Sequence, residues 1–257
     1  MTSIDLNSDM GERPGALRDG SEELLMQYIS SANIACGVHA GDAATMRAVV
    51  RLAKLYGVGI GAHPSFPDRE NFGRTEMNLS SDEIRRCVRD QVKALADIVS
   101  EEHAELVHVK PHGALYNVAV NDTSVAEAIA RGVADVSKLL ILLGLAGSRM
   151  LQIWKGLGFA VAGEAFVDRM YEPNGTLRSR KFPDALIVDP VRAAQQAVGI
   201  VKDGTIIAVD RSSLKVHAQT ICTHSDTPGS DRIAAAVRAA LEQAGVKVLA
   251  LGKIVSL

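Results

Sequence analysis

Short apolar runs alternate with longer amphipathic stretches along almost the whole of this 257-residue chain. The apolar runs lie at residues 4–6, 32–36, 58–62, 106–109, 139–143, 159–162, 205–209, 215–222 and 246–251. Runs of this length are typical of strands buried in a sheet, whereas the stretches between them repeat their apolar residues at helical spacing. Strands that alternate with helices predict βαβ units and a parallel sheet.

The helical stretches lie at residues 42–56, 80–99, 122–137, 189–202 and 230–245. Ser80 and Glu83 have the spacing of a capping box, and Ser230 and Gly245 are placed to start and stop the last helix. Two strand-like runs occur within residues 205–222 without a helix between them, and no G-x-G-x-x-G follows a strand. A closed or nearly closed β/α barrel fits this order better than a doubly wound sheet. We therefore expect a single α/β domain, a β/α barrel, over residues 1–257.

The charge balance argues against several classes of partner. The formal net charge is −2 and the basic residues are scattered, so nothing favours binding to nucleic acid or to a membrane surface. Cys36, Cys87 and Cys222 are odd in number and far apart, which argues against a disulfide framework or a cysteine zinc site. The first residues carry no targeting pattern, and the longest apolar run, 139–145, is too short for a bilayer. We expect a cytoplasmic protein.

Polar and titratable side chains follow most of the predicted strands. In chain order they are Asn7, Asp9 and Glu12, then Cys36, His39 and Asp42, then His63 and Asp68, then Lys110, His112 and Asn117, then Glu164, Asp168 and Arg169, and last His224 and Asp226. In a β/α barrel the carboxyl ends of the strands meet at one rim, where the loops build the active site. We therefore expect these side chains to converge there.

Each of these residues also has a structural explanation. Asp9 could cap a turn, His63 could be a core histidine, and Arg169 could simply pair with Asp168. Lys110 is harder to explain by packing, because an apolar strand runs directly into a lysine. Histidines and carboxylates together permit a divalent metal site, but no H-E-x-x-H occurs, so a tightly bound metal stays an open question.

Six segments that contain these residues carry a resemblance to a known family. They lie at 4–12, 31–42, 61–74, 109–117, 164–171 and 221–228, and the fourth reads Val109-Lys110-Pro111-His112-Gly113-Ala114-Leu115-Tyr116-Asn117. Taken in order, they resemble the LamB/YcsF family over nearly the whole chain. Val38, the Ser65-Phe66 pair, Thr223 and Ser225 depart from the family pattern, while the polar residues are kept.

The resemblance implies a distorted, seven-stranded β/α barrel of the glycoside hydrolase/deacetylase type. It also implies ATP-dependent hydrolysis of the lactam of 5-oxo-L-proline to L-glutamate, with the chain as the A subunit of a 5-oxoprolinase that also contains B and C subunits. ATP, with Mg²⁺, is the implied cofactor. Since the sequence has no Walker A motif, the ATP site lies either in the barrel loops or on one of the partner chains.

Roles for lactam chemistry can be assigned to the polar residues as expectations. Lys110 would stabilise the developing oxyanion, Arg74 or Arg169 would hold the substrate carboxylate, and Asp9 or Glu164 would act as general base with a histidine partner. The predicted catalytic residues are Asp9, His39, His63, Lys110, His112 and Glu164. The predicted substrate-binding residues are Asn7, Glu12, Asp42, Arg74, Asn117, Asp168, Arg169, His224 and Asp226.

Two other classes of function stay open at the level of sequence. The chain could be a metal-dependent amidohydrolase or deacetylase that needs no ATP. It could also be a non-catalytic subunit that only presents substrate to its partners.

Overall fold

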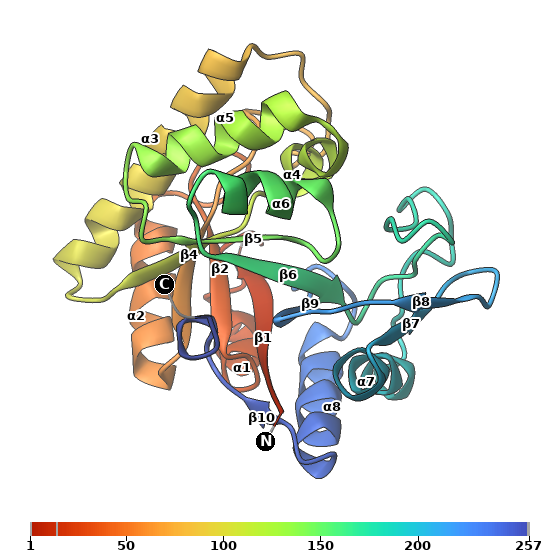
Figure 1. Cartoon of the computed structure of the whole chain (residues 1–257). Coiled ribbons are helices and arrows are strands. Elements are labelled where there is room, and N and C mark those ends of the chain that lie inside the picture. Colours follow the sequence, from red (N-terminus) through yellow and green to blue (C-terminus); the bar gives the residue numbers. More distant parts are fainter. Residues whose placement is uncertain (1, 14, 256–257) are drawn as a thin grey trace.

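Seven parallel strands close into a barrel in the computed structural model, which describes residues 2–13 and 15–255. The strands are β1 (Ser3–Met10), β2 (Ser31–Ala35), β3 (Gly59–His63), β4 (Leu106–Val109), β5 (Ile141–Leu145), β6 (Val161–Phe166) and β9 (Thr220–Thr223). Each strand pairs with the next, and β9 pairs with both β6 and β1, which closes the barrel (Figure 1). The predicted seven-stranded parallel barrel is therefore confirmed.

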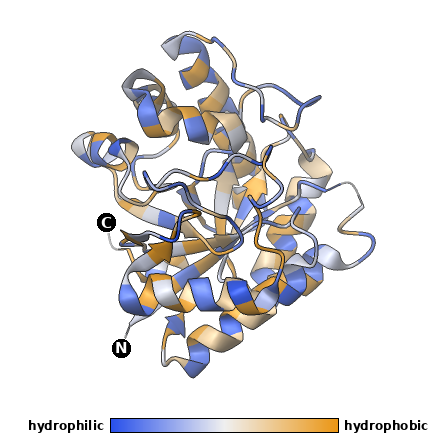
Figure 2. Ribbon diagram, turned by 90° about the vertical axis from the view of Figure 1, so that its right-hand side faces the viewer, coloured by the Kyte–Doolittle hydropathy of each residue, from blue (hydrophilic) through white to orange (hydrophobic). Residues whose placement is uncertain are grey.

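Helices surround the barrel and cover the outer faces of its strands (Figures 1 and 2). They are α1 (Ser21–Met26), α2 (Ala43–Tyr56), α3 (Ser81–Glu101), α4 (Gly113–Asn121), α5 (Thr123–Ala134), α6 (Arg149–Gly156), α7 (Pro190–Val198) and α8 (Ser230–Gln243). The capping box at Ser80 and Glu83 forms as predicted. The prediction that Ser230 caps the last helix is wrong. Gly229 takes that position in a left-handed conformation, and the Ser230 hydroxyl donates to the Ser225 carbonyl instead.

Residues 205–222 depart from the simple strand prediction. A small antiparallel pair, β7 (Thr205–Ile207) with β8 (Ser213–Lys215), lies apart from the barrel. Only the end of the predicted 215–222 run, β9, enters the barrel sheet. Near the carboxyl end, β10 (Lys247–Val248) pairs with the start of β1. Because β7 and β8 are antiparallel, a short turn can join them, and no crossover helix is needed between them.

The interior of the barrel is more polar than the strand pattern indicated. Asp5, Asn7 and Asp9 alternate along β1, so they share one face, and Glu164 lies within β6 rather than after it. The Asp5 carboxylate accepts hydrogen bonds from Ser30, Ser31 and Thr220, and its burial raises its pKa to about 6. Polar residues of β1 and β6 thus face the barrel interior, and both strands continue past the apolar runs that marked them in the sequence.

One glycine lets a polar layer form inside the barrel. A side chain at Gly61 of β3 would meet the His108 ring, because a Cβ atom there would lie 2.0 Å from Nε2. His108 is buried, and its Nε2 contacts the Asn33 amide oxygen at 2.8 Å.

None of the helices in the described part of the chain is long and apolar enough to cross a membrane.

Candidate active site

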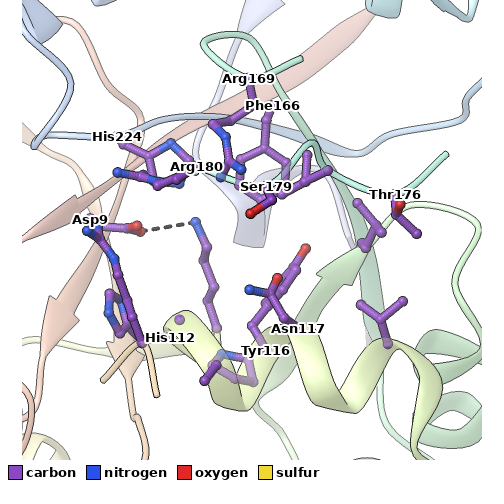
Figure 3. A pocket seen from close by; sticks show the side chains of 18 of the residues that line it. Asp9, His112, Tyr116, Asn117, Phe166, Arg169, Thr176, Ser179, Arg180 and His224 are labelled. Carbon is purple, nitrogen blue, oxygen red and sulfur yellow. Dashed lines mark hydrogen bonds and ion pairs between the residues drawn. The ribbon is translucent and has the colours of Figure 1, made fainter. Parts of the chain in front are cut away.

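A pocket of about 610 Å³ opens at the carboxyl ends of the barrel strands. Its floor comes from Asp9 of β1, His63 of β3, Lys110 after β4 and His224 after β9, and residues 176–181 form its outer wall. Figure 3 shows Asp9, His112 and His224 on the left of the cavity, Thr176 on the right, and Arg169 and Ser179 in the upper middle of the view. A pocket therefore lies at the rim where the sequence predicted the site.

Lys110 occupies the centre of the floor. Its Nζ lies 3.0 Å from Asp9 Oδ1 and 2.8 Å from Glu164 Oε1, and it also lies 3.1 Å from Cys222 Sγ. Burial alone would lower the pKa of Lys110, but attraction by Asp9 and Glu164 raises it well above its ordinary value. The ammonium group is therefore charged, and only 3% of the residue is exposed, which strengthens its field in the pocket. Tyr116 donates to the other oxygen of Glu164, so that carboxylate is fully engaged.

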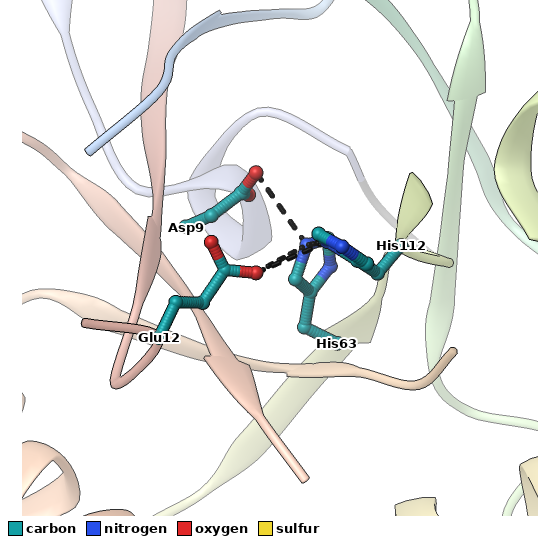
Figure 4. A group of neighbouring side chains, drawn as sticks. All are labelled: Asp9, Glu12, His63 and His112. Atoms are coloured by element: carbon teal, nitrogen blue, oxygen red, sulfur yellow. Dashed lines mark hydrogen bonds and ion pairs between the residues drawn. The ribbon is translucent and has the colours of Figure 1, made fainter. Parts of the chain in front are cut away.

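A group of three histidines and two carboxylates lies beside Lys110. We call Asp9, Glu12, His39, His63 and His112 the Glu12 cluster, because Glu12 Oε1 lies 2.9 Å from His39 Nε2 and 3.0 Å from His112 Nδ1. Figure 4 shows four of these side chains, Asp9, Glu12, His63 and His112. Burial raises the pKa of Glu12, yet the contacts with His112 and His39 outweigh it, and the net pKa lies well below the ordinary value. Burial lowers the pKa of His39 to about 4, so this ring is neutral at pH 7.

Backbone geometry fixes the rings of the Glu12 cluster. His63 Nδ1 lies 2.7 Å from the Lys110 carbonyl oxygen, and His112 Nε2 lies 2.8 Å from the Phe72 carbonyl oxygen. Gly113 has φ +55°, and a Cβ atom there would lie 2.5 Å from the Gly73 carbonyl oxygen. This glycine therefore allows the loop with Phe72 to lie directly against His112.

A second imidazole–carboxylate arrangement lies at the carboxyl end of β9, close to Asp9. In this Asp168–His224 pair, His224 Nδ1 lies 2.9 Å from Asp168 Oδ1. The other carboxylate oxygen accepts from the His224 backbone N–H and from the Thr227 hydroxyl. Burial of Asp168 raises its pKa, but His224 and these hydrogen bonds bring it below the ordinary value. The His224 ring stacks on Phe166 with centroids 5.3 Å apart and lines the pocket, so its orientation is well fixed.

Arginines dominate the outer wall. Arg169 is only 7% exposed, and one of its terminal nitrogens donates to the Arg178 carbonyl oxygen. Its Nε has no hydrogen-bond partner, and no carboxylate among the described residues lies within ion-pair distance. Burial, together with nearby Arg180, lowers the pKa of Arg169 to about 10, which still leaves it charged at pH 7. A buried guanidinium without a carboxylate partner is suited to an anionic ligand.

The structure gathers most of the predicted site residues. Those that line the pocket are Asp9, His63, Arg74, Lys110, His112, Asn117, Arg169 and His224. Those buried behind the lining are Asn7, Glu12, His39, Glu164 and Asp168. Asp226 contacts both Arg74 and Arg180 and so ties the outer wall to the loop after β3.

Asp42 does not join this group. It is exposed, and its carboxylate accepts from the Thr45 backbone N–H to cap α2. The Asp-x-x-Thr spacing at a helix start was the signal for this role. Three contributors were not predicted: Asn33, which donates to Asp9 and Asn7; Tyr116, which holds Glu164; and Arg180, which pairs with Asp226. Asn33 and Tyr116 lie in segments that carry the family resemblance, whereas Arg180 lies outside all six.

Two sets of side chains in the site have donor atoms close enough to hold a metal ion. Asp9, Glu12, His63 and His112 form one set, and Asp9, Cys222 and His224 form the other. Within each set the ligand atoms lie within 4.8 Å of one another. Mixed nitrogen and oxygen donors of the first kind suit divalent ions such as Zn²⁺ or Mn²⁺.

Known proteins resemble this chain over nearly its whole length. The A subunit of 5-oxoprolinase from Chloroflexus aggregans is 51% identical over 248 residues, which cover 96% of this chain and 98% of that protein. The A subunit of 5-oxoprolinase from Pyrococcus furiosus is 46% identical, over 98% of this chain and 99% of that protein.

Solved structures agree with the sequence relatives. The lactam utilization protein from Thermus thermophilus superposes with a TM-score of 0.90 at 42% identity, covering 97% of this chain and 100% of that one. A family 4 carbohydrate esterase from Streptomyces lividans superposes with a TM-score of 0.53 at 11% identity, covering 100% and 97%, which shows a shared fold alone. The predicted deacetylase-like barrel is therefore confirmed. The LamB/YcsF family model matches residues 4–256, and the chain accordingly belongs to the LamB/YcsF family.

Proposed function

We propose that this chain catalyses the opening of the lactam of 5-oxo-L-proline to L-glutamate, coupled to ATP hydrolysis, as the A subunit of a 5-oxoprolinase that also contains B and C subunits. The observation that carries the proposal is the pairing of two buried cations in one pocket. Lys110 lies at the floor and Arg169 in the wall, and both line the cavity. A small cyclic amide with a carboxylate offers one anionic group and one polarisable carbonyl, which match these two cations.

Arg169 is the candidate anchor for the substrate carboxylate. Its guanidinium has donors in a fixed plane and no carboxylate partner of its own among the described residues. Arg74 also lines the pocket, but Asp226 already engages it. These contacts favour Arg169 over Arg74 for this role.

Lys110 is the candidate stabiliser of charge at the lactam carbonyl. Opening the ring requires water to add to the carbonyl carbon, the carbon–nitrogen bond to break, and the nitrogen to gain a proton. A fixed ammonium in a dry site lowers the barrier to the first step, because it is aimed at the oxygen where negative charge develops. Transfer of the terminal phosphoryl group of ATP to that oxygen, with ADP as leaving group, would make the carbon more electrophilic, and Lys110 would face the added charge. Water addition and cleavage of the carbon–nitrogen bond would then leave a glutamyl phosphate, from which a second water would release phosphate and glutamate.

The Asp168–His224 pair is the better candidate for general base. Asp9 and Glu164 were the predicted bases, but both contact Lys110. Burial raises the pKa of Asp9, but His63 and Lys110 outweigh this effect and hold the pKa well below its ordinary value. A carboxylate that weakly basic accepts a proton poorly at neutral pH. Asp168 orients the His224 ring through Nδ1, which leaves Nε2 to take a proton from water, as in other carboxylate–imidazole pairs.

The test uses a cell extract that contains the B and C subunits but lacks this chain. Purified protein, ATP, Mg²⁺ and 5-oxoproline are added, and glutamate and ADP are followed together. The proposal predicts that both products form in matched amounts only when the chain is present. Formation of neither product, with the chain shown to be folded, would contradict it.

A second candidate function rests on the Glu12 cluster. Its donor set could serve a metal-dependent amidohydrolase or deacetylase that needs no ATP. Activity on an amide that is lost to a chelator and indifferent to nucleotide would favour this alternative over the oxoprolinase.

A further inference from the structure

Two histidine nitrogens face each other at the centre of the Glu12 cluster, in a contact that requires a positive charge between them. The His63 Nδ1 and His112 Nε2 atoms each point at a backbone carbonyl oxygen, which can only accept. Each of these nitrogens therefore carries the ring hydrogen. In the neutral rings, His63 Nε2 and His112 Nδ1 hold lone pairs, and the two atoms lie only 3.0 Å apart.

Two carboxylates converge on the same point. Glu12 Oε1 lies 3.0 Å from His112 Nδ1 and 3.6 Å from His63 Nε2. Asp9 turns Oδ2 toward His63 Nε2 at 3.4 Å, while its Oδ1 contacts Lys110. Within the described chain, Glu12 has no lysine or arginine at ion-pair distance, only imidazoles. Buried carboxylates are costly without a cation, so this arrangement favours one.

We propose that Asp9, Glu12, His63 and His112 bind one divalent transition-metal ion. Contacts of 3.0, 3.4 and 3.6 Å join their ligand atoms. Neighbouring ligands on an ion with bonds of about 2.1 Å lie roughly 3.0–3.4 Å apart, so little movement is required. Both histidines also donate their second nitrogen to a backbone carbonyl, which is the usual arrangement of metal-binding imidazoles.

The donor set selects among metals and between the two possible places. Two imidazoles with two carboxylates favour Zn²⁺, Co²⁺ or Mn²⁺ over Ca²⁺ and Mg²⁺, which prefer oxygen alone. The alternative set of Asp9, Cys222 and His224 is less suitable. Lys110 Nζ lies 3.1 Å from Cys222 Sγ, so a metal ion there would face the ammonium group directly.

An ion bound beside the pocket would supply Lewis-acid polarisation of a carbonyl or activation of a water molecule. The binding itself does not depend on which substrate the pocket accepts. It can therefore be measured without 5-oxoproline, ATP or partner chains, and its failure is distinguishable from failure of the proposed function.

The experiment titrates the chelator-stripped 257-residue chain with ZnCl₂ and CoCl₂. Calorimetry gives the affinity, mass spectrometry of the dialysed protein gives the zinc content, and visible absorption reports the cobalt geometry. We expect about one ion per wild-type chain. His63→Gln and Asp9→Asn should each weaken the affinity by more than about 100-fold, because even an outer partner of a ligand contributes 10–100-fold.

His217→Gln is the matched control, because His217 is exposed and far along the chain from the cluster. Circular dichroism and thermal unfolding check that each variant is folded. If His63→Gln does not fold, Asp9→Asn provides the test of the metal ligands. Two results would overturn the proposal: a wild-type chain that binds no zinc at micromolar concentration, or ligand variants that bind as tightly as wild type. A proton shared between His63 and His112 would then fill the place of the ion.

Discussion

The barrel rim holds two groups of imidazoles and carboxylates that are built in opposite ways. In the Asp168–His224 pair, one carboxylate holds one ring, takes two further hydrogen bonds and leaves the outer ring nitrogen free at the pocket. In the Glu12 cluster, ring nitrogens and carboxylate oxygens all converge on a shared point. The first arrangement suits proton transfer, whereas the second suits a bound cation. Lys110 contacts Asp9 of the Glu12 cluster, and Asp9 also lies close to His224, so variants in either group test the difference.

The largest effect is expected at Lys110. Lys110→Met should lower turnover by roughly 10³-fold or more, because a fixed charge at an oxyanion contributes about that much. The variant also leaves Asp9 and Glu164 buried without their cation, so its fold must be checked by circular dichroism. If Lys110→Met does not fold, Lys110→Arg is the second variant. It keeps the positive charge and should therefore retain more activity than a variant that removes it. Lys215→Met, at an exposed lysine of β8, is the control. A folded Lys110→Met variant with unchanged rate would remove the residue from the mechanism.

The next effect separates the two groups. His224→Gln and Asp168→Asn should each lower the rate of glutamate formation by roughly 10²–10⁴-fold, the usual contribution of a general base. The Kd for 5-oxoproline should change little, because the proposed role as general base replaces the substrate-binding role that the sequence predicted for both residues. Paired calorimetry and turnover measurements check this. If both variants weaken binding and leave turnover at saturation unchanged, the chain presents substrate rather than transforming it.

A smaller effect is expected at the outer wall. Arg169→Gln should raise the Kd for 5-oxoproline about 10–100-fold, because a charged hydrogen bond contributes about 1.5–3 kcal/mol. Because Arg169 is buried without a carboxylate partner, the same change should not reduce the free energy of unfolding. Calorimetry measures the Kd for 5-oxoproline, and urea unfolding measures the free energy of unfolding. Arg86→Gln, at an exposed arginine of α3, is the control. Unchanged affinity would assign the carboxylate to another residue.

The smallest effect concerns the support of the Glu12 cluster. Glu22 accepts from the Gly11 backbone N–H, and burial raises its pKa from 4.5 to about 7. The folded state therefore holds a proton that the unfolded chain loses above pH 4.5. Glu22 should therefore contribute a loss of stability of roughly 1–3 kcal/mol as the pH rises from about 4.5 to 7, and no further loss above that. Glu22→Gln should remove this contribution, while Glu23→Gln, at its exposed neighbour, should keep it. Urea unfolding at about pH 5 and pH 8 measures both; equal slopes in wild type and Glu22→Gln would contradict the shift.

The barrel and the rim could be predicted from the sequence because both follow from local patterns. Apolar runs marked the strands, and polar residues at their ends marked Asp9, His63, Lys110 and His112. The strand ends were harder to predict, because Asn7 and Glu164 face a polar interior that breaks the apolar pattern. Such an interior depends on contacts between distant segments, and no local spacing reveals them.

Roles within the rim were less predictable than its location. Asp42 has the same local setting as the catalytic candidates, but its carboxylate faces Thr45 and solvent. The preference for His224 over Glu164 as base depends on which carboxylate contacts Lys110, and that is set by barrel closure. Arg180 lies in an irregular loop, where no periodicity indicates which way a side chain points.

We infer that the Glu12 cluster binds a metal ion, whereas the Asp168–His224 pair transfers a proton. One pair of variants, His63→Gln and His224→Gln, tests it most directly when zinc content and glutamate formation are measured on the same preparations. We predict that His63→Gln loses both zinc and turnover, whereas His224→Gln keeps about one zinc per chain and loses turnover. Loss of zinc from His224→Gln, or its retention by His63→Gln, would contradict the division.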